Sequence, residues 1–291
     1  MNKISVVFLF TAVEGFSVPS SSAVNTQLKA DLLLRIQELR TLKERDGDFS
    51  IDFGVKGGEI DKKSRAPQKV NFYSISEDVG KAADEVIGIT NELQKNSPTE
   101  HPTLYLGDKD KGNEAPLNGE WKLLFTTAAD ASFSKNSKRG SASVKNVVDA
   151  TKGRITNVID FEGGSAADDD DATSVKKEPL VKQLNVVIAA KPAGKSRVGL
   201  QFKYAKIVLS RFFGWKRQWN LYIPVPAPFI TRLIVFFNRI FRFGRKGKNV
   251  PPMAYFDVLY LDNELRIQRT GEDNLFVQAK PTWEEAVPFF T

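Results

Sequence analysis

The residue types that most often carry catalysis are scarce in this chain of 291 residues. It has no cysteine and a single histidine, His101. Thiolate nucleophiles, thiolate metal sites and a histidine-based triad or metal centre are therefore not expected. His101 stands between Glu100 and Pro102 in a turn-rich segment, which is typical of an exposed loop. We expect no catalytic residues, no metal site and no cofactor, and hence a protein that is not an enzyme.

The densest run of charge is a row of four aspartates, Asp168 to Asp171. Carboxylates could bind a cation, but four adjacent side chains on a loop point in different directions. Because the run lies between two predicted strands, we interpret it as a solvated loop.

One arginine near the C-terminus calls for a partner. Residues 255–269 hold two apolar runs on either side of an Asp-Asn-Glu turn, the pattern of a β-hairpin. In the second arm Leu265, Ile267 and Arg269 share one face, because strand side chains alternate. Burying a lone charge on an apolar face is costly. We therefore expect Arg269 to meet either a partner elsewhere in the chain or a ligand.

The second half of the chain carries the pattern of strands. From Leu117 onward apolar residues alternate with polar ones, which predicts about eight strands and an antiparallel barrel or sandwich. The predicted apolar faces are formed by Trp121, Leu123 and Phe125, by Ile155, Ile159 and Phe161, by Leu184, Val186 and Ile188, and by Val198, Leu200, Phe202 and Tyr204.

Residues 229–248 interrupt the strand pattern and favour an inserted amphipathic helix. No acid occurs between Asn220 and Asp257, so the positive charge there is unbalanced. A basic, aromatic helix of this kind suits an anionic lipid surface, and the alternative is a helix that covers the sheet with its arginines in water. The residues expected to contact a membrane are Arg232, Leu233, Phe237, Arg239, Ile240, Phe241 and Arg242.

The N-terminal part predicts a leader followed by two helices. Lys3, an apolar run and a small-residue context indicate a signal peptide over residues 1–15. Residues 16–27 are rich in serine and have no acid, like the transit segment of algae whose plastids came from a eukaryotic endosymbiont; a plain secretory signal is the alternative. Apolar residues at helical spacing predict helices over about 27–45 and 76–94, the second capped by Ser74 or Ser76. We therefore divide the rest into a helical region, 28–114, and a β domain, 115–291.

Two stretches in this order resemble the plastid lipid-associated protein (fibrillin) family. The first is Leu93–Thr99 followed by Leu117–Thr127, and the second is Tyr260–Arg269 followed by Leu275–Val277. The resemblance covers about residues 28–280. One departure concerns the turn after Arg269, where the family has two glycines and this chain has only Gly271, with Asp273 and Asn274 in place of the second. Asp and Asn tolerate the same backbone conformations.

The resemblance implies a lipocalin-like antiparallel barrel that binds apolar plastid molecules and associates with thylakoids or plastid lipid droplets (plastoglobules). In a lipocalin-like barrel an arginine commonly lies across the tryptophan of the first strand, so Arg269 or Arg266 would cover Trp121, as a plug or as a contact to a ligand head group. The expected ligand-binding residues are Trp121, Phe125, Phe161, Phe202, Tyr204, Phe256, Tyr260 and Arg269.

Three functions stay open on these grounds. The first is a non-catalytic binder of an isoprenoid, such as a carotenoid or prenylquinone, or of another lipid. The second is a structural coat on lipid droplets, and the third a scaffold or accessory partner of prenylquinone-synthesising enzymes. The net charge of +7 also suits nucleic acid, but no nucleic-acid partner is expected because that reading leaves the family motifs unexplained.

Overall fold

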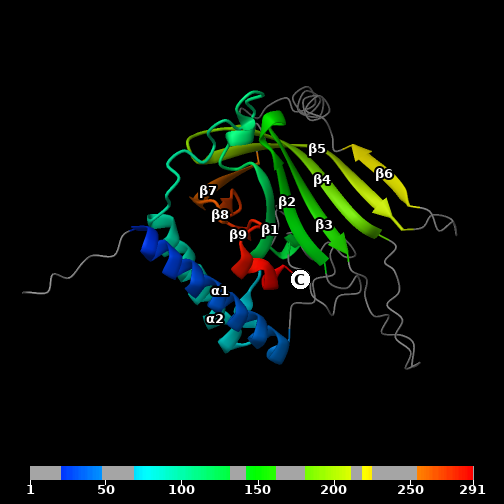
Figure 1. The fold of residues 1–291 in the computed structure, drawn as a ribbon. Coiled ribbons are helices and arrows are strands. Elements are labelled where there is room, and N and C mark those ends of the chain that lie inside the picture. The colour runs from blue at the N-terminus through cyan, green and yellow to red at the C-terminus, as the bar shows by residue number, and fades with distance from the viewer. Residues whose placement is uncertain are drawn as a thin grey trace, which may run out of the picture.

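The computed structural model describes residues 21–47, 69–131, 142–161, 181–210, 218–224 and 254–290. Two long helices come first in the described chain and nine strands follow (Figure 1). The helices are α1 (Ser21–Asp46) and α2 (Glu77–Lys95). The strands are β1 (Gly119–Thr126), β2 (Ala142–Asp149), β3 (Arg154–Phe161), β4 (Val181–Pro192), β5 (Arg197–Leu209), β6 (Trp219–Pro224), β7 (Tyr255–Leu261), β8 (Leu265–Thr270) and β9 (Leu275–Ala279).

All nine strands belong to one antiparallel sheet, and the sheet closes into a ring. The order is β4-β3-β2-β1-β9-β8-β7-β5-β6, and β4 also pairs with β5. Eight strands thus form the ring, while β6 is attached to the edge of β5 outside it. The mainly β architecture with N-terminal helices was predicted; β2 and β6 were not. In β2 the regular alternation is broken by Asn146, and β6 is a run of only six residues that ends in Pro224.

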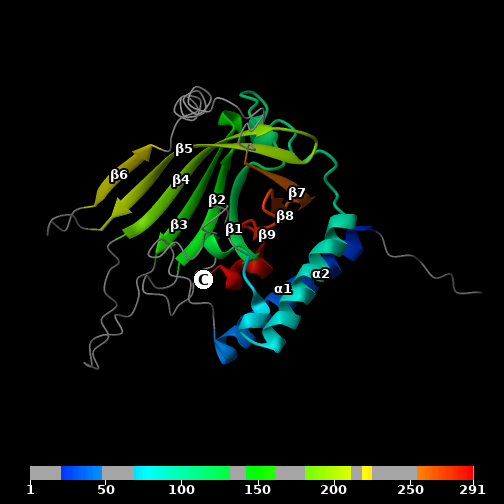
Figure 2. The ribbon, with the colours of Figure 1, turned by 180° about the vertical axis from the view of Figure 1, so that it is seen from behind.

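The ring is closed unequally at its two ends, because β7 and β6 share one edge of β5. On β5, β7 pairs only with Arg197–Gly199 at the start of the strand, whereas β6 pairs with Tyr204–Leu209 at its far end. Beyond β7, therefore, β4 and β5 run on without returning to the rest of the ring. In Figures 1 and 2 these strands and β6 extend away from the helices and from β7–β9. We call the side at the start of β5 the closed end and the other side the open end.

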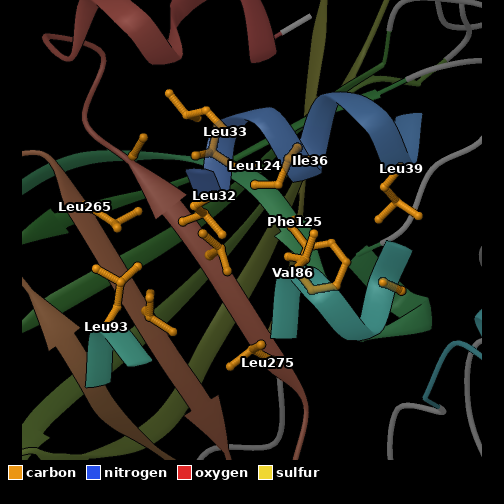
Figure 3. Packing of buried hydrophobic residues seen from close by; sticks show 14 of the residues in the cluster. Leu32, Leu33, Ile36, Leu39, Val86, Leu93, Leu124, Phe125, Leu265 and Leu275 are labelled. Carbon is orange, nitrogen blue, oxygen red and sulfur yellow. The ribbon is translucent and has the colours of Figure 1, made fainter. Parts of the chain in front are cut away.

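The helices pack against each other and cover the outer face of β1, β9, β8 and β7 (Figures 1 and 2). α2 begins where predicted, since the Ser76 side chain accepts a hydrogen bond from the Val79 backbone N–H at 3.2 Å and caps the helix. α1 begins at Ser21, so the last part of the leader-like segment, 21–27, is helical. Figure 3 shows Leu32, Ile36 and Leu93 from the helices meeting Leu265 and Leu275 from the strands. We call this the helix-facing cluster.

A second cluster lies inside the ring at its closed end. It gathers apolar side chains from six strands and from the loop before β1, namely Leu117, Trp121, Val148, Ile155, Ala190, Val198, Phe256, Val258 and Leu261. Strand alternation explains the two clusters: β8 gives Leu265 and Ile267 to the helices and turns Arg266 inward.

The turns around β8 are built as expected. The Asp262 side chain accepts hydrogen bonds from the backbone N–H groups of Glu264 and Leu265, at 2.8 and 2.7 Å, and so forms the hairpin turn. Asp273 adopts a left-handed conformation with φ of 63° where the family has glycine. The predicted leader before residue 21, the acidic run and the segment 229–248 lie outside the described residues.

Candidate ligand site inside the ring

Trp121 is the largest fully buried side chain among the described residues and marks the base of the ring interior. It is 0% exposed, and its indole N–H donates a 2.9 Å hydrogen bond to the Leu117 carbonyl. Gly119 starts β1 with φ of +113°, a conformation that glycine adopts without strain. The turn at Leu117 and the first residues of β1 thereby fix the indole in place.

Arg266 lies over this indole and is itself 0% exposed. The guanidinium carbon is 5.0 Å from the centre of the Trp121 ring, within the range of a cation–π contact. Nε donates to Oε1 of Gln278 at 3.0 Å, and Nη2 donates to Oδ1 of Asn146 at 2.6 Å and also to Gln278. The base of the interior is thus a buried cation held by two amides and an aromatic ring.

The amides belong to a network that follows the strand pairing. Trp121 is paired with Asn146, Asn146 with Asn157, and Arg266 with Gln278. Gln278 donates to Asn146 at 2.8 Å, and Asn146 donates to Asn157 at 2.7 Å. Every partner of the Arg266 guanidinium in this network is neutral.

The charge of Arg266 is therefore not balanced by a carboxylate. Burial lowers the pKa of Arg266 to about 9, and no acidic group of the described chain acts on it. The group stays protonated at neutral pH. Its Nη1 is buried and has no hydrogen-bond partner, and on the same strand Oε1 of the buried Gln268 also has none. Unpartnered buried polar atoms are uncommon in proteins, so these two positions need an explanation.

A second cation lies nearby. Nζ of Lys280, just after β9, is also 5.0 Å from the centre of the Trp121 ring. Burial lowers the pKa of Lys280 and the positive charge of Arg266 lowers it further, while Asp262 opposes the shift. The closed end of the ring is therefore positively charged.

Of the two arginines expected to cover Trp121, Arg269 does not lie across it. Its Nη1 pairs with Oδ1 of Asp273 at 3.2 Å on the outer side of the hairpin, in a partly exposed position. Arg266, the alternative named from the family resemblance, takes the place over the tryptophan. Arg269 shares its face with Leu265 and Ile267 as predicted, but that face looks toward the helices and not into the ring.

β-Bulges explain why three of the predicted ligand-binding aromatics are not on the inner face. The pairing shifts between Leu123 and Phe125, between Phe202 and Tyr204, and between Val258 and Tyr260, with one extra residue in the strand each time. An extra residue moves every following side chain to the other face. The three residues after the bulges, Phe125, Tyr204 and Tyr260, are thereby turned away from the interior.

The contacts of these three residues agree with their outward placement. Phe125 stacks on Phe72 in the helix-facing cluster with ring centres 5.7 Å apart. Tyr260 is in the same cluster, and its hydroxyl donates to Asp262 at 2.7 Å; burial and this acid raise the pKa of the phenol. Tyr204 meets Tyr222 of β6 at 5.9 Å.

The other predicted aromatics are on the inner face, although not all together. Trp121 and Phe256 share the closed-end cluster. Phe161 is buried near the open end, and Phe202 on β5 is 42% exposed. Sequence reasoning missed Asn146, Asn157, Gln278 and Lys280. The inward amides of β2, β3 and β9 interrupt the apolar alternation. A search for strands by a two-residue apolar period therefore passes over them.

Neither a metal cluster nor a membrane span is found in the part of the chain that the structure describes. No group of three or more acidic or histidine side chains there could hold a metal ion. No helix of that part is long and apolar enough to cross a bilayer.

The fold and site define a β-ring protein with helices on one outer face and a cationic base inside the ring. The sequence profile of the PAP_fibrillin family matches residues 76–279, more than two thirds of the chain, and the chain belongs to this family. The match spans α2 and the whole sheet. Comparison with curated proteins gives no significant match, and comparison with solved structures gives none either.

Membership of this family makes the chain a plastid lipid-associated structural protein and implies that it works in plastids. Proteins of the family are generally structural, lipid-associated proteins.

Proposed function

We propose that the chain is a non-catalytic lipid-binding protein of plastids, and that its β-ring is a lipocalin-like barrel that takes up one lipid from the open end. The lipid is an isoprenoid, such as a carotenoid or prenylquinone, or another lipid with a long apolar part. The protein works at the surface of thylakoids or plastoglobules, reached through the signal and transit segments of its leader.

One observation carries this proposal: the apolar inner face is buried at the closed end and partly exposed toward the open end. Val148, Ile155 and Ile188 are 2–3% exposed. Farther along β2 and β4 the inner-face residues Val144, Leu184 and Val186 remain only half-buried. Apolar side chains inside a protein are normally packed against each other, so a half-buried inner face is available to an apolar ligand.

The inner face continues without interruption onto β6. Leu221 pairs with Ile207 and Ile223 with Ala205, so both lie on the inner side of the sheet. They are 51% and 44% exposed. A run of apolar side chains thus leads from the ring interior to the surface, and it suits a lipid that passes between a membrane and the ring.

The test is to isolate the protein from its own source without detergent and to identify extracted lipids by mass spectrometry. We expect about one lipid per chain, and we expect lipid-free protein to rebind it on titration. Protein that carries no lipid and binds none would overturn the proposal in favour of a coat protein filled by its own side chains.

Membrane contact through residues 229–248 is tested separately by flotation with liposomes that contain anionic lipid. Replacing Phe237, Ile240 and Phe241 with serine should release the protein from the liposomes. Unchanged flotation would show that this segment is not the docking surface.

A further inference from the structure

We propose that Arg266 and Lys280 form a head-group site for a lipid carboxylate, with the acyl chain of the ligand lying along the inner face toward β5 and β6. The inference rests on the proposed function, because it names the chemical class of the lipid that the ring holds.

The first support is the unused hydrogen-bonding capacity of Arg266. A guanidinium has five N–H donors in a planar fork that matches a carboxylate. Gln278 and Asn146 accept from Nε and Nη2, and Nη1 is left without a partner in a fully buried position. An arginine that only covers Trp121 does not need an unpartnered Nη1 donor in the ring interior. A bound carboxylate would satisfy it.

The second support is the charge balance. The partly exposed arginines of the described sheet are paired with aspartates, for example Arg154 with Asp149 and Arg197 with Asp257. Arg266, the fully buried one, has only neutral partners. A buried unpaired charge is strongly destabilising, and the same site places the amine of Lys280 against the same indole ring. An anionic head group would compensate both cations, whereas a neutral quinone or alcohol would compensate neither.

The third support is the direction in which the interior continues. From Arg266 the inner side of β8 leads through Gln268 to Thr270, over about 13 Å at 3.3 Å per residue. Gln268 is 6% exposed with an unpartnered Oε1, and the facing Phe276 of β9 is half-buried. The path ends at the open end, where the exposed Phe202 and Leu221 lie on the same inner face. The site thus offers a charged base, and the inner face continues from it past Gln268 and Thr270 to the exposed apolar side chains at the open end.

The experiment compares two ligands with the same chain and different heads, oleate and oleyl alcohol, both kept below their aggregation limits. Lipid-free full-length protein is titrated with each, and dissociation constants are measured by displacement of a fluorescent fatty-acid analogue. We expect oleate to bind at least about tenfold more tightly than the alcohol, because a charge-assisted hydrogen bond in a buried site discriminates by that order. Equal affinities would overturn the proposal without any variant being needed.

Variants locate the head group. Arg266→Gln removes the charge and retains an amide, and it should abolish the preference for oleate. Arg266→Lys should restore part of it. Arg269→Gln is the matched control: it removes an arginine of the same strand from the outer face, and it should leave the preference unchanged. A preference that survives in a folded Arg266→Gln protein would show that the head group lies elsewhere.

Two further measurements distinguish a failure of the head-group site from a failure of the proposed lipid-binding function. Acetate and inorganic phosphate should not raise the melting temperature as oleate does. An equal rise would identify a site for small free anions and would contradict the proposal that the ligand is a lipid. If the alcohol and oleate bind equally well, the head-group site fails and the lipid-binding function stands. If neither binds and no lipid is extracted from the native protein, the proposed function itself fails.

Discussion

The two faces of β7, β8 and β9 are built on different principles. The outer face meets the helices mainly through apolar side chains, such as Leu265, Ile267 and Val277, all of them 0% exposed. The inner face carries Arg266, Gln268 and Gln278 on alternate positions of the same strands, and two of their polar atoms lack partners. A filled apolar face stabilises the fold, whereas a charged and incompletely satisfied one is retained where a ligand is held. Changes on the outer face should therefore affect stability, and changes on the inner face should affect binding.

The largest expected effect is on the outer face. Leu32 of α1 is 0% exposed, and Leu32→Ala should lower the free energy of unfolding by about 3 kcal/mol, since it leaves a cavity between helices and sheet. Leu34→Ala on the same helix is the control, because Leu34 is 62% exposed and its loss should cost less than about 0.5 kcal/mol. Denaturant unfolding measures both. Lipid affinity of the folded Leu32→Ala protein should be unchanged, and a large loss of affinity would break the division between the two faces.

A smaller effect on stability is expected for Trp121→Phe on the inner face. The change removes the hydrogen bond to Leu117 and weakens the cation–π contact with Arg266, for a loss of about 2 kcal/mol. Denaturant unfolding of Trp121→Phe, Arg266→Gln and the double variant gives their coupling energy, which we expect at about 1 kcal/mol. The preference for oleate should persist in Trp121→Phe. If it disappears, the tryptophan itself contacts the ligand and the ring has no separate plug.

The smallest effect is expected at the turn between β7 and β8. Oδ2 of Asp262 accepts from the Tyr260 hydroxyl at 2.7 Å and from Nζ of Lys29 on α1 at 3.0 Å, and Oδ1 accepts from the turn backbone. Asp262→Asn keeps an oxygen for the turn but weakens the link to the helix, for a loss of about 1 kcal/mol at neutral pH. Denaturant unfolding at several pH values checks this.

The same variant has a defined pH dependence. Burial acts to raise the pKa of Asp262, but hydrogen bonds from the Leu265 and Glu264 backbone, from Tyr260 and from Lys29 outweigh it and hold the pKa below its usual value. A carboxyl with a lowered pKa in the folded state stabilises fully above its unfolded pKa, about 3.9, and loses this contribution as the pH falls through the folded value. The wild type should therefore lose more stability than Asp262→Asn below about pH 4. Parallel curves there would show that the carboxylate has no stabilising partner.

Local sequence signals were sufficient for both helices and for most of the strands. The helical spacing and Ser76 predicted α2 and its cap, and the Asp262 turn predicted the terminal hairpin. Two family motifs, one at each end of the β domain, indicated the family, and the sequence profile confirmed it. These features depend on residues that are close in the chain, so they can be predicted from the sequence.

The faces of the strands could not be predicted in the same way. Three bulges, before Phe125, Tyr204 and Tyr260, reverse the side of the sheet on which the following residues lie. A bulge is a property of a pair of strands, and one strand read alone does not contain it. The sheet also has apolar surroundings on both sides, the helices outside and the closed-end cluster inside, so an apolar face does not by itself point to the ring interior.

The amino-acid sequence by itself determined that this is a mainly β protein of the fibrillin family with N-terminal helices, a capped second helix and a closing hairpin. Only the tertiary structure decided that Arg266, and not Arg269, lies over Trp121, and that the amides of Asn146 and Gln278 hold it there. The physical reason is that Arg266 and Asn146, which are 120 residues apart in the chain, meet through strand register, and register is set by the whole ring.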